Sequence, residues 1–63
     1  MTVEEYLNKH YWVENFIIIT LVNWTTKILY DTAETTADLS NMLYDSIIES
    51  VYTDDNGITV IEI

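Results

Sequence analysis

Acidic side chains are the first candidates for chemistry in this chain. They recur through the segment AETTADLSNMLYDSIIES, residues 33–50, which contains no lysine or arginine. Asp38, Asp45 and Glu49 follow one another at intervals of seven and four residues. At about 100° per helical residue, such side chains project within roughly 40° of one another. The spacing therefore predicts a negative ridge along one face of a helix.

The dimensions of this ridge suit imitation of a nucleic acid. Helical residues four apart lie about 6 Å from each other and those seven apart about 10 Å, which is comparable with successive phosphates on a strand. Further acids precede and follow the ridge, and Tyr52 continues its edge as a neighbouring contact. We therefore expect the partner-binding residues to be Asp31, Glu34, Asp38, Asp45, Glu49, Tyr52, Asp54 and Asp55.

Stability alone does not favour this arrangement. Asp45 and Glu49 lie toward the C-terminal end of the predicted helix, where the helix dipole makes lysine better by about 0.3–1 kcal/mol each. Like charges on neighbouring helical positions also oppose folding. The acids are therefore explained either by binding or by the solubility that they give to a half-apolar protein, and a halophilic source would produce the same composition.

The sequence supports a catalytic function less well than a binding function. A hydrolytic triad needs a nucleophile beside His10, but the serines lie within the predicted helix and none is in a glycine-flanked turn. Paired carboxylates can act as acid and base, yet those of this chain are expected on exposed faces, without the burial that shifts a pKa. We predict that the chain is not an enzyme and that His10 is an ordinary residue of a first helix.

The stretch TDDNGIT invites comparison with a calcium-binding loop. When Asn56 and Gly57 are aligned with positions five and six of an EF-hand, Tyr52 and Ile63 occupy positions one and twelve, where carboxylates are required. A turn in which Gly57 supplies a positive φ fits better. A single glycine also excludes a phosphate-binding glycine loop. We expect no metal and no other cofactor.

Composition bounds the class of protein. The chain of 63 residues is expected to form a single domain, residues 1–63, with one core and marginal stability unless a disulfide, a metal or a partner subunit helps. It has no cysteine, which excludes disulfides and argues against the common zinc sites. A hydrophobic content of 49% favours a globular fold despite the net charge of −9. Two basic residues against eleven acids argue against direct binding of DNA or RNA, so the partner should be basic.

The cellular location is inferred from the N-terminus and from the longest apolar run. MTVEEYLNKH begins with acids, where a secretory leader would carry positive charge. The run FIIITLV is far shorter than the roughly 20 residues that a membrane-crossing helix needs. Anionic lipids would also repel so acidic a protein. We expect a cytoplasmic protein without membrane association.

Periodicity predicts the elements that position these residues. Thr2 and Glu5 fit a capping box, which predicts a short helix from about Val3 to Tyr11. Two segments dense in β-branched or alternating residues, Phe16 to Val22 and Thr25 to Asp31, are predicted to be strands.

The turn between these two strands is poorly signalled. It falls near Asn23 and Trp24 and lacks the glycine that tight hairpins favour. A rival interpretation joins residues 3–30 into one long helix, because apolar residues there also recur at intervals of three and four. Nine of the eighteen residues from Val13 to Tyr30 are β-branched, which favours the strands.

The acidic segment is predicted to form a second helix from Thr35 or Thr36 to about Val51. Its buried stripe is expected to consist of Leu39, Leu43, Ile47 and Val51, with Met42 alongside. Residues 54–57 should form a turn and residues 58–63 a last strand. The order αββαβ predicts an α+β fold: a three-stranded, mainly antiparallel sheet packed by this amphipathic helix, with the short N-terminal helix at the other face or at an end.

The first predicted strand is apolar on both sides, and one small helix cannot easily cover both faces of a sheet. Either the N-terminal helix covers the second face or another copy of the chain does. Tyrosine and tryptophan, which are numerous here, are favoured at interfaces as well as in cores. We expect a homodimer.

In size and charge the chain is similar to the small acidic inhibitors that bacteriophages and other mobile elements use against CRISPR, restriction, repair or transcription enzymes. This similarity is one of composition and involves no motif. It implies a phage-encoded inhibitor that presents carboxylates, as a DNA or RNA mimic, to the basic nucleic-acid-binding groove of a host enzyme. The alternative is a self-associating structural or assembly module whose acidic surface serves only solubility.

Overall fold

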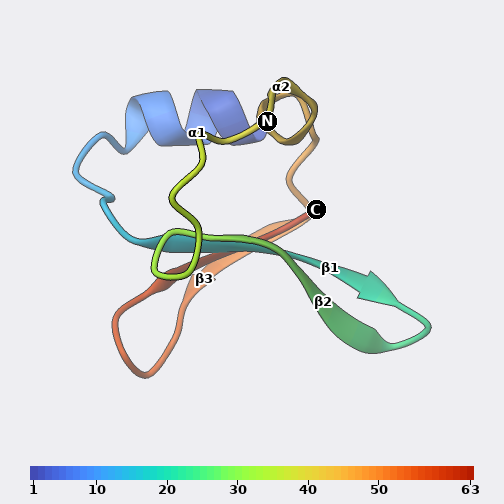
Figure 1. The fold of residues 1–63 in the computed structure, drawn as a ribbon. Helices are drawn as coiled ribbons and strands as arrows, with labels where there is room; N and C mark the ends of the chain where they lie inside the picture. The colour runs from blue at the N-terminus through green and yellow to red at the C-terminus, as the bar shows by residue number, and fades with distance from the viewer.

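The computed structural model describes residues 1–63, which form a four-stranded sheet with two helices on one of its faces (Figure 1). The prediction of a small α+β fold is confirmed. Neither helix has the length and apolar character that a membrane span requires. The elements in chain order are α1 (Val3–Lys9), β1 (Phe16–Val22), β2 (Thr25–Asp31), α2 (Asn41–Tyr44), β3 (Ser50–Thr53) and β4 (Thr59–Glu62).

The sheet differs from the predicted one in strand number and direction. Its order is β2, β1, β4, β3. The pairs β1–β2 and β3–β4 are antiparallel, but the two central strands, β1 and β4, are parallel. The prediction of three mainly antiparallel strands is therefore wrong in detail, since the sheet is four-stranded and mixed. The additional strand is β3, which begins at Ser50 where the sequence predicted the end of a helix.

The capping box that predicts α1 is present. The Thr2 hydroxyl accepts a hydrogen bond from the Glu5 N–H at 3.2 Å, and the Glu5 carboxylate accepts one from the Thr2 N–H at 3.0 Å. Glu4 and Glu5 occupy the first turn and Lys9 the last, which is the arrangement that the helix dipole favours. The helix ends at Lys9, two residues before the predicted end.

The strands β1 and β2 have the predicted bounds, and the rival long helix is excluded. Val22 pairs with Thr25, so Asn23 and Trp24 alone make the turn. The other predicted turn, between β3 and β4, is also present, and Gly57 has the expected positive φ, +79°.

The long helix predicted from residue 35 to residue 51 is wrong, because α2 has only four residues. Ser40 caps it, because its hydroxyl accepts a hydrogen bond from the Leu43 N–H at 3.3 Å. After α2, backbone groups that a longer helix would need for its own hydrogen bonds are bonded to the N-terminal segment instead. The Val3 N–H donates to the Ser46 carbonyl at 3.0 Å, and the Ile48 N–H donates to the Met1 carbonyl at 2.9 Å. These bonds divert the chain out of the helix and toward β3.

The main cluster of buried residues lies between the helices and the sheet and consists of Val3, Ile18, Leu39 and Ile61; Ile19 and Val60 are buried as well but lie outside this cluster. The predicted helical stripe contributes to it only in part. Leu39 is buried, and Leu43 and Val51 pack against the core half-buried. Ile47 and Met42 are 62% and 80% exposed, so their predicted burial is wrong.

The face of the sheet opposite the helices has no covering element, because α1 lies beside α2 and not across the sheet from it (Figure 1). Ile18 points into the core, so its neighbours Ile17 and Ile19 point to this opposite face. Register partners on adjacent strands share a face, which extends the assignment across the sheet. We call this side the open face, and its apolar residues are Ile17, Ile19, Leu21, Ile28, Tyr52 and Val60.

Candidate functional site

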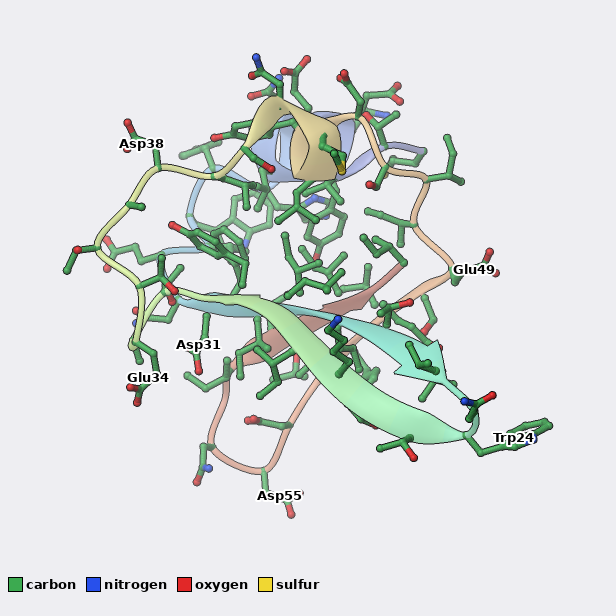
Figure 2. All side chains as sticks on the ribbon, turned by 45° about the vertical axis from the view of Figure 1, so that its right-hand side comes forward. Trp24, Asp31, Glu34, Asp38, Glu49 and Asp55 are labelled. Carbon is green, nitrogen blue, oxygen red and sulfur yellow. The ribbon has the colours of Figure 1, made fainter.

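The acids predicted to form one ridge lie on different sides of the molecule. With no helix from residue 35 to residue 51, nothing aligns Asp38, Asp45 and Glu49 on one face. Figure 2 shows Asp38 on one side of the domain and Glu49 on the opposite side. Asp38 precedes α2, Asp45 is its C-cap, and Glu49 lies just before β3. The predicted helical ridge is therefore wrong.

The structure does bring together three of the predicted residues in one connection. We call residues 31–38, which lead from β2 toward α2, the acidic loop; it contains Asp31, Glu34 and Asp38. In Figure 2 Asp31 and Glu34 lie below the sheet, whereas Asp38 lies on the same side of the domain but at the level of the helices. Glu34 and Asp38 are exposed and Asp31 is half-buried. Three of the seven predicted acids therefore lie on one loop.

Hydrogen bonds hold the acidic loop in place along its length. The Asp31 carboxylate accepts from the Ala33 N–H at 2.9 Å, and the Asp31 carbonyl accepts from the Glu34 N–H at 3.1 Å. Thr32 bonds to the backbone of Phe16, accepting from its N–H at 3.1 Å through the hydroxyl. Near the other end, the Tyr30 hydroxyl donates to the Ala37 carbonyl at 2.8 Å. The carboxylates of Glu34 and Asp38 thus project from a loop with a defined path.

Asp54, one of the predicted binding residues, has a structural role in the turn between β3 and β4. Its carboxylate accepts hydrogen bonds from the N–H groups of Asn56 and Ile58, at 2.8 and 2.9 Å, inside the turn between β3 and β4. Asp55, by contrast, is exposed at the end of that turn and free to meet a partner (Figure 2). Tyr52 is 51% exposed, but it lies on the open face and not beside Glu49 on a helix.

The carboxylates are not neutralised within the molecule. Those that accept hydrogen bonds do so from backbone N–H groups or from the Ser50 hydroxyl, and no hydrogen bond joins Lys9 or Lys27 to an acid. At Glu5, the hydrogen bond from the Thr2 backbone, together with that of its side chain, holds the pKa of the carboxyl below its ordinary value of 4.5. The net charge of −9 is therefore presented to the surroundings.

The surface that carries these acids is not hollowed. The structure contains no pocket, and no three His, Asp or Glu side chains come close enough to share a metal ion. The acidic loop is accordingly a projecting surface, suited to contact another surface. That the chain is not an enzyme stays a prediction.

His10 belongs to an aromatic group at the end of α1. Its ring stacks on Tyr6 at a centroid distance of 4.0 Å and meets the edge of Trp12 at 5.1 Å. Its Nδ1 lies 2.9 Å from the Tyr6 carbonyl, and because a carbonyl only accepts, Nδ1 carries the proton. These contacts give His10 a structural role as the C-cap of α1, one position beyond the last residue of the helix.

Sequence reasoning missed Trp24 as a candidate functional residue. Trp24 is 96% exposed, more than any other large apolar side chain of the protein, and it forms the tip of the β1–β2 hairpin (Figure 2). Its φ is +65°, and that of Asn23 is +52°. Two positive φ values in a two-residue turn define the type I′ hairpin, which ordinarily has glycine at the second position. The absence of glycine at this turn was the signal in the sequence that could have identified Trp24, because a tryptophan there neither favours the turn nor packs in the core.

No protein-family model matches the chain, and neither a curated protein nor a solved structure was found to be similar to it.

Proposed function

We propose that this protein inhibits a host enzyme by binding the enzyme's basic nucleic-acid-binding groove, with carboxylates in the place of DNA or RNA phosphates. The observation that carries the proposal is the imbalance of charge on the surface: eleven acids, two lysines and no lysine–carboxylate hydrogen bond. A cationic partner supplies the counter-charge that the chain lacks. Opposite charge also accelerates encounter and favours the correct partner over neutral proteins.

The acidic loop is the part of the surface best placed to make the central contact. Glu34 and Asp38 are exposed there, Asp31 is half-buried at the start of the loop, and the loop is fixed by the hydrogen bonds of Tyr30 and Thr32. A fixed loop loses little conformational freedom on binding, which increases affinity. Acids elsewhere, including Asp45, Glu49 and Asp55, contribute to the field that attracts the partner without belonging to the same contact.

Capture from a bacterial lysate tests this function. Immobilised protein is incubated with lysate at low salt, and bound proteins are eluted either with high salt or with duplex DNA and identified by mass spectrometry. We expect nucleic-acid-binding proteins that are released by both treatments, because salt screens exposed charges and DNA competes for the same groove. A polyglutamate peptide on the same resin is the control for simple ion exchange.

Two results would contradict the proposal. Proteins that stay bound at high salt and are not displaced by duplex DNA would show that the contact is not electrostatic and that no nucleic-acid groove is occupied. A set of captured proteins identical to that of the polyglutamate resin would show that charge alone, without the fold, accounts for binding.

A further inference from the structure

The β1–β2 hairpin differs in charge from the rest of the molecule. Residues 15–30 contain no aspartate or glutamate, although the whole chain has eleven, and they include Lys27, one of the two lysines. The acids thus lie outside this segment. In a protein with a net charge of −9, the hairpin is the region where a second negatively charged molecule meets the least repulsion.

The same hairpin exposes a group of large apolar side chains. Its far half projects beyond the rest of the sheet and ends in Trp24 (Figure 2). Four of its apolar residues are exposed, Leu21 (49%), Val22 (47%), Trp24 (96%) and Ile28 (58%), and Leu21 and Ile28 lie together on the open face. Aromatic side chains bury about 150–250 Å² at interfaces, so Trp24 alone can supply roughly a quarter of the ~800 Å² that each partner buries in a standard interface.

The outer edge of this hairpin is also available for pairing. β2 is an edge strand of seven residues, and its only strand neighbour is β1. Along its outer edge its backbone has no strand partner, and such an edge is a template for another strand. Ile28 is the middle residue of β2 and lies on the open face with Ile19.

We infer that two copies of this chain associate through their β2 edges to form a two-fold symmetric dimer. A two-fold axis at the middle of antiparallel β2 strands brings the two Ile28 side chains together and continues the open face from one copy into the other. Lys27 of each copy meets the net negative charge of the other. Asp31, the last residue of β2, lies at the end of the paired strands, whereas Glu34 and Asp38 lie beyond them and remain exposed to a basic partner.

A second copy fits this surface better than a basic protein or a nucleic acid. Apart from Asp31 at the end of β2, the hairpin offers no carboxylate to a cation, and the net charge of the chain repels phosphates. Electrostatic repulsion between two copies is, in contrast, weakest where acids are absent. Self-association also adds stability that the small core does not supply, since only six of the 63 residues are buried and the chain has no disulfide.

Sedimentation velocity of the whole protein tests the dimer, with concentration varied from micromolar to millimolar. We expect the mass to rise from 7.4 kDa toward twice that value, and the association to strengthen with salt because repulsion between the copies is screened. Binding of a basic partner weakens with salt, so failure of one proposal is distinguishable from failure of the other. A monomer at every concentration and salt would overturn the inference.

Two matched charge variants locate the interface. Ile28→Glu places two acids face to face at the proposed two-fold axis, and we expect dimerisation to weaken about tenfold or more. Tyr52→Glu adds the same charge to a similarly exposed residue of the open face, but on the opposite edge strand, and we expect little change. Far-ultraviolet circular dichroism confirms that each variant is folded. Dissociation by Tyr52→Glu and not by Ile28→Glu would place the contact on β3 and overturn the inference.

Fluorescence of Trp24 distinguishes a second copy from a lipid surface. In a Trp12→Phe background Trp24 is the only tryptophan, and we expect its emission to shift to shorter wavelength as protein concentration rises. Vesicles of phosphatidylcholine are the comparison. A shift that requires vesicles, in a protein that stays monomeric, would overturn the inference in favour of interfacial lipid binding.

Discussion

The carboxylate of Asp54 accepts a hydrogen bond from the Ile58 N–H at 2.9 Å, and the Asp54 N–H donates to the Ile58 carbonyl at the same distance. The same carboxylate oxygen accepts from the Asn56 N–H at 2.8 Å. Asp54 thus closes the turn that joins the two strands β3 and β4. An acid that the sequence predicts to contact a partner thus also organises a turn of the sheet.

Replacing Asp54 with alanine should destabilise the protein. Two backbone N–H groups lose their acceptor, and we expect the free energy of unfolding to fall by about 1–2 kcal/mol. Asp54→Asn retains an oxygen in the same position and should cost less. Urea denaturation followed by circular dichroism measures both, and Asp55→Ala is the control that should change little. An equal loss for the Asp54→Ala and Asp55→Ala variants would contradict the structural role.

Trp24→Gly should stabilise the monomer. A residue other than glycine in the left-handed region lowers the stability of the folded state by about 1–2 kcal/mol. Trp24 has such a φ, and its side chain offsets little of this loss by packing because it is 96% exposed. We expect a gain of about 1 kcal/mol, which for a domain of this size raises the melting temperature by roughly 4–8 °C. Trp12→Gly is the matched control, since Trp12 has no positive φ, and it should not stabilise. A melting temperature lowered by Trp24→Gly would show that the side chain supports the fold.

Elements with strong local signals were predicted correctly from the sequence. The capping box of Thr2 and Glu5 needs only four consecutive residues, and it forms as expected. The β-branched residues of β1 and the alternation in β2 set the bounds of both strands, because side-chain shape acts locally on the backbone. These signals located the hairpin even though its turn lacks glycine.

The predicted long helix failed because its alternative depends on residues far away in the sequence. An apolar period of three and four is present from Leu39 to Val51, but Ser46 and Ile48 bond to the N-terminal segment. The Ser46 hydroxyl also bonds to the Met42 carbonyl at 2.9 Å, a local competitor of helix continuation. No pattern within residues 35–51 indicates these long-range bonds, and the acidic ridge, which depended on the helix, failed with it.

The parallel pairing of β1 with β4 was also outside the reach of local patterns. Ile18 pairs with Ile61, which is 43 positions further along the chain, and both are fully buried. The apolar character of each strand predicted burial but not its neighbour or direction. For the site, the sequence identified which residues are acidic, whereas the fold decided which of them are exposed and which lie on the same loop.

Lowering the pH should remove part of the stability of α1 through Glu5. The hydrogen bonds from Thr2 favour the ionised carboxylate, so its pKa in the folded protein lies below 4.5. A depressed pKa contributes stability that is fully present above the unfolded value and is lost as the pH falls through the folded value. The difference in melting temperature between the wild-type protein and Glu5→Gln should therefore be constant near neutral pH and shrink below about 4.5. A difference that grows as the pH falls would contradict this role.

Two double variants of equal charge separate the acidic loop from the overall field. Glu34→Gln/Asp38→Asn and Asp45→Asn/Glu49→Gln each change the net charge from −9 to −7. All four residues are exposed, so we expect the stability of both variants to stay within about 0.5 kcal/mol of the wild-type protein. Against a basic protein identified by capture, the first variant should raise Kd about tenfold or more, since it removes direct contacts. The second should mainly slow association, as loss of steering does.

The comparison is made by calorimetry and stopped-flow at low and at high salt. The slower association of the Asp45→Asn/Glu49→Gln variant should disappear at high salt, where the Debye length is short. A larger Kd for the Glu34→Gln/Asp38→Asn variant should remain, in part, because contacts within an interface are screened less than distant charges. Equal effects of the two variants would mean that the enzyme responds to total charge, and the acidic loop would then have no special part in binding.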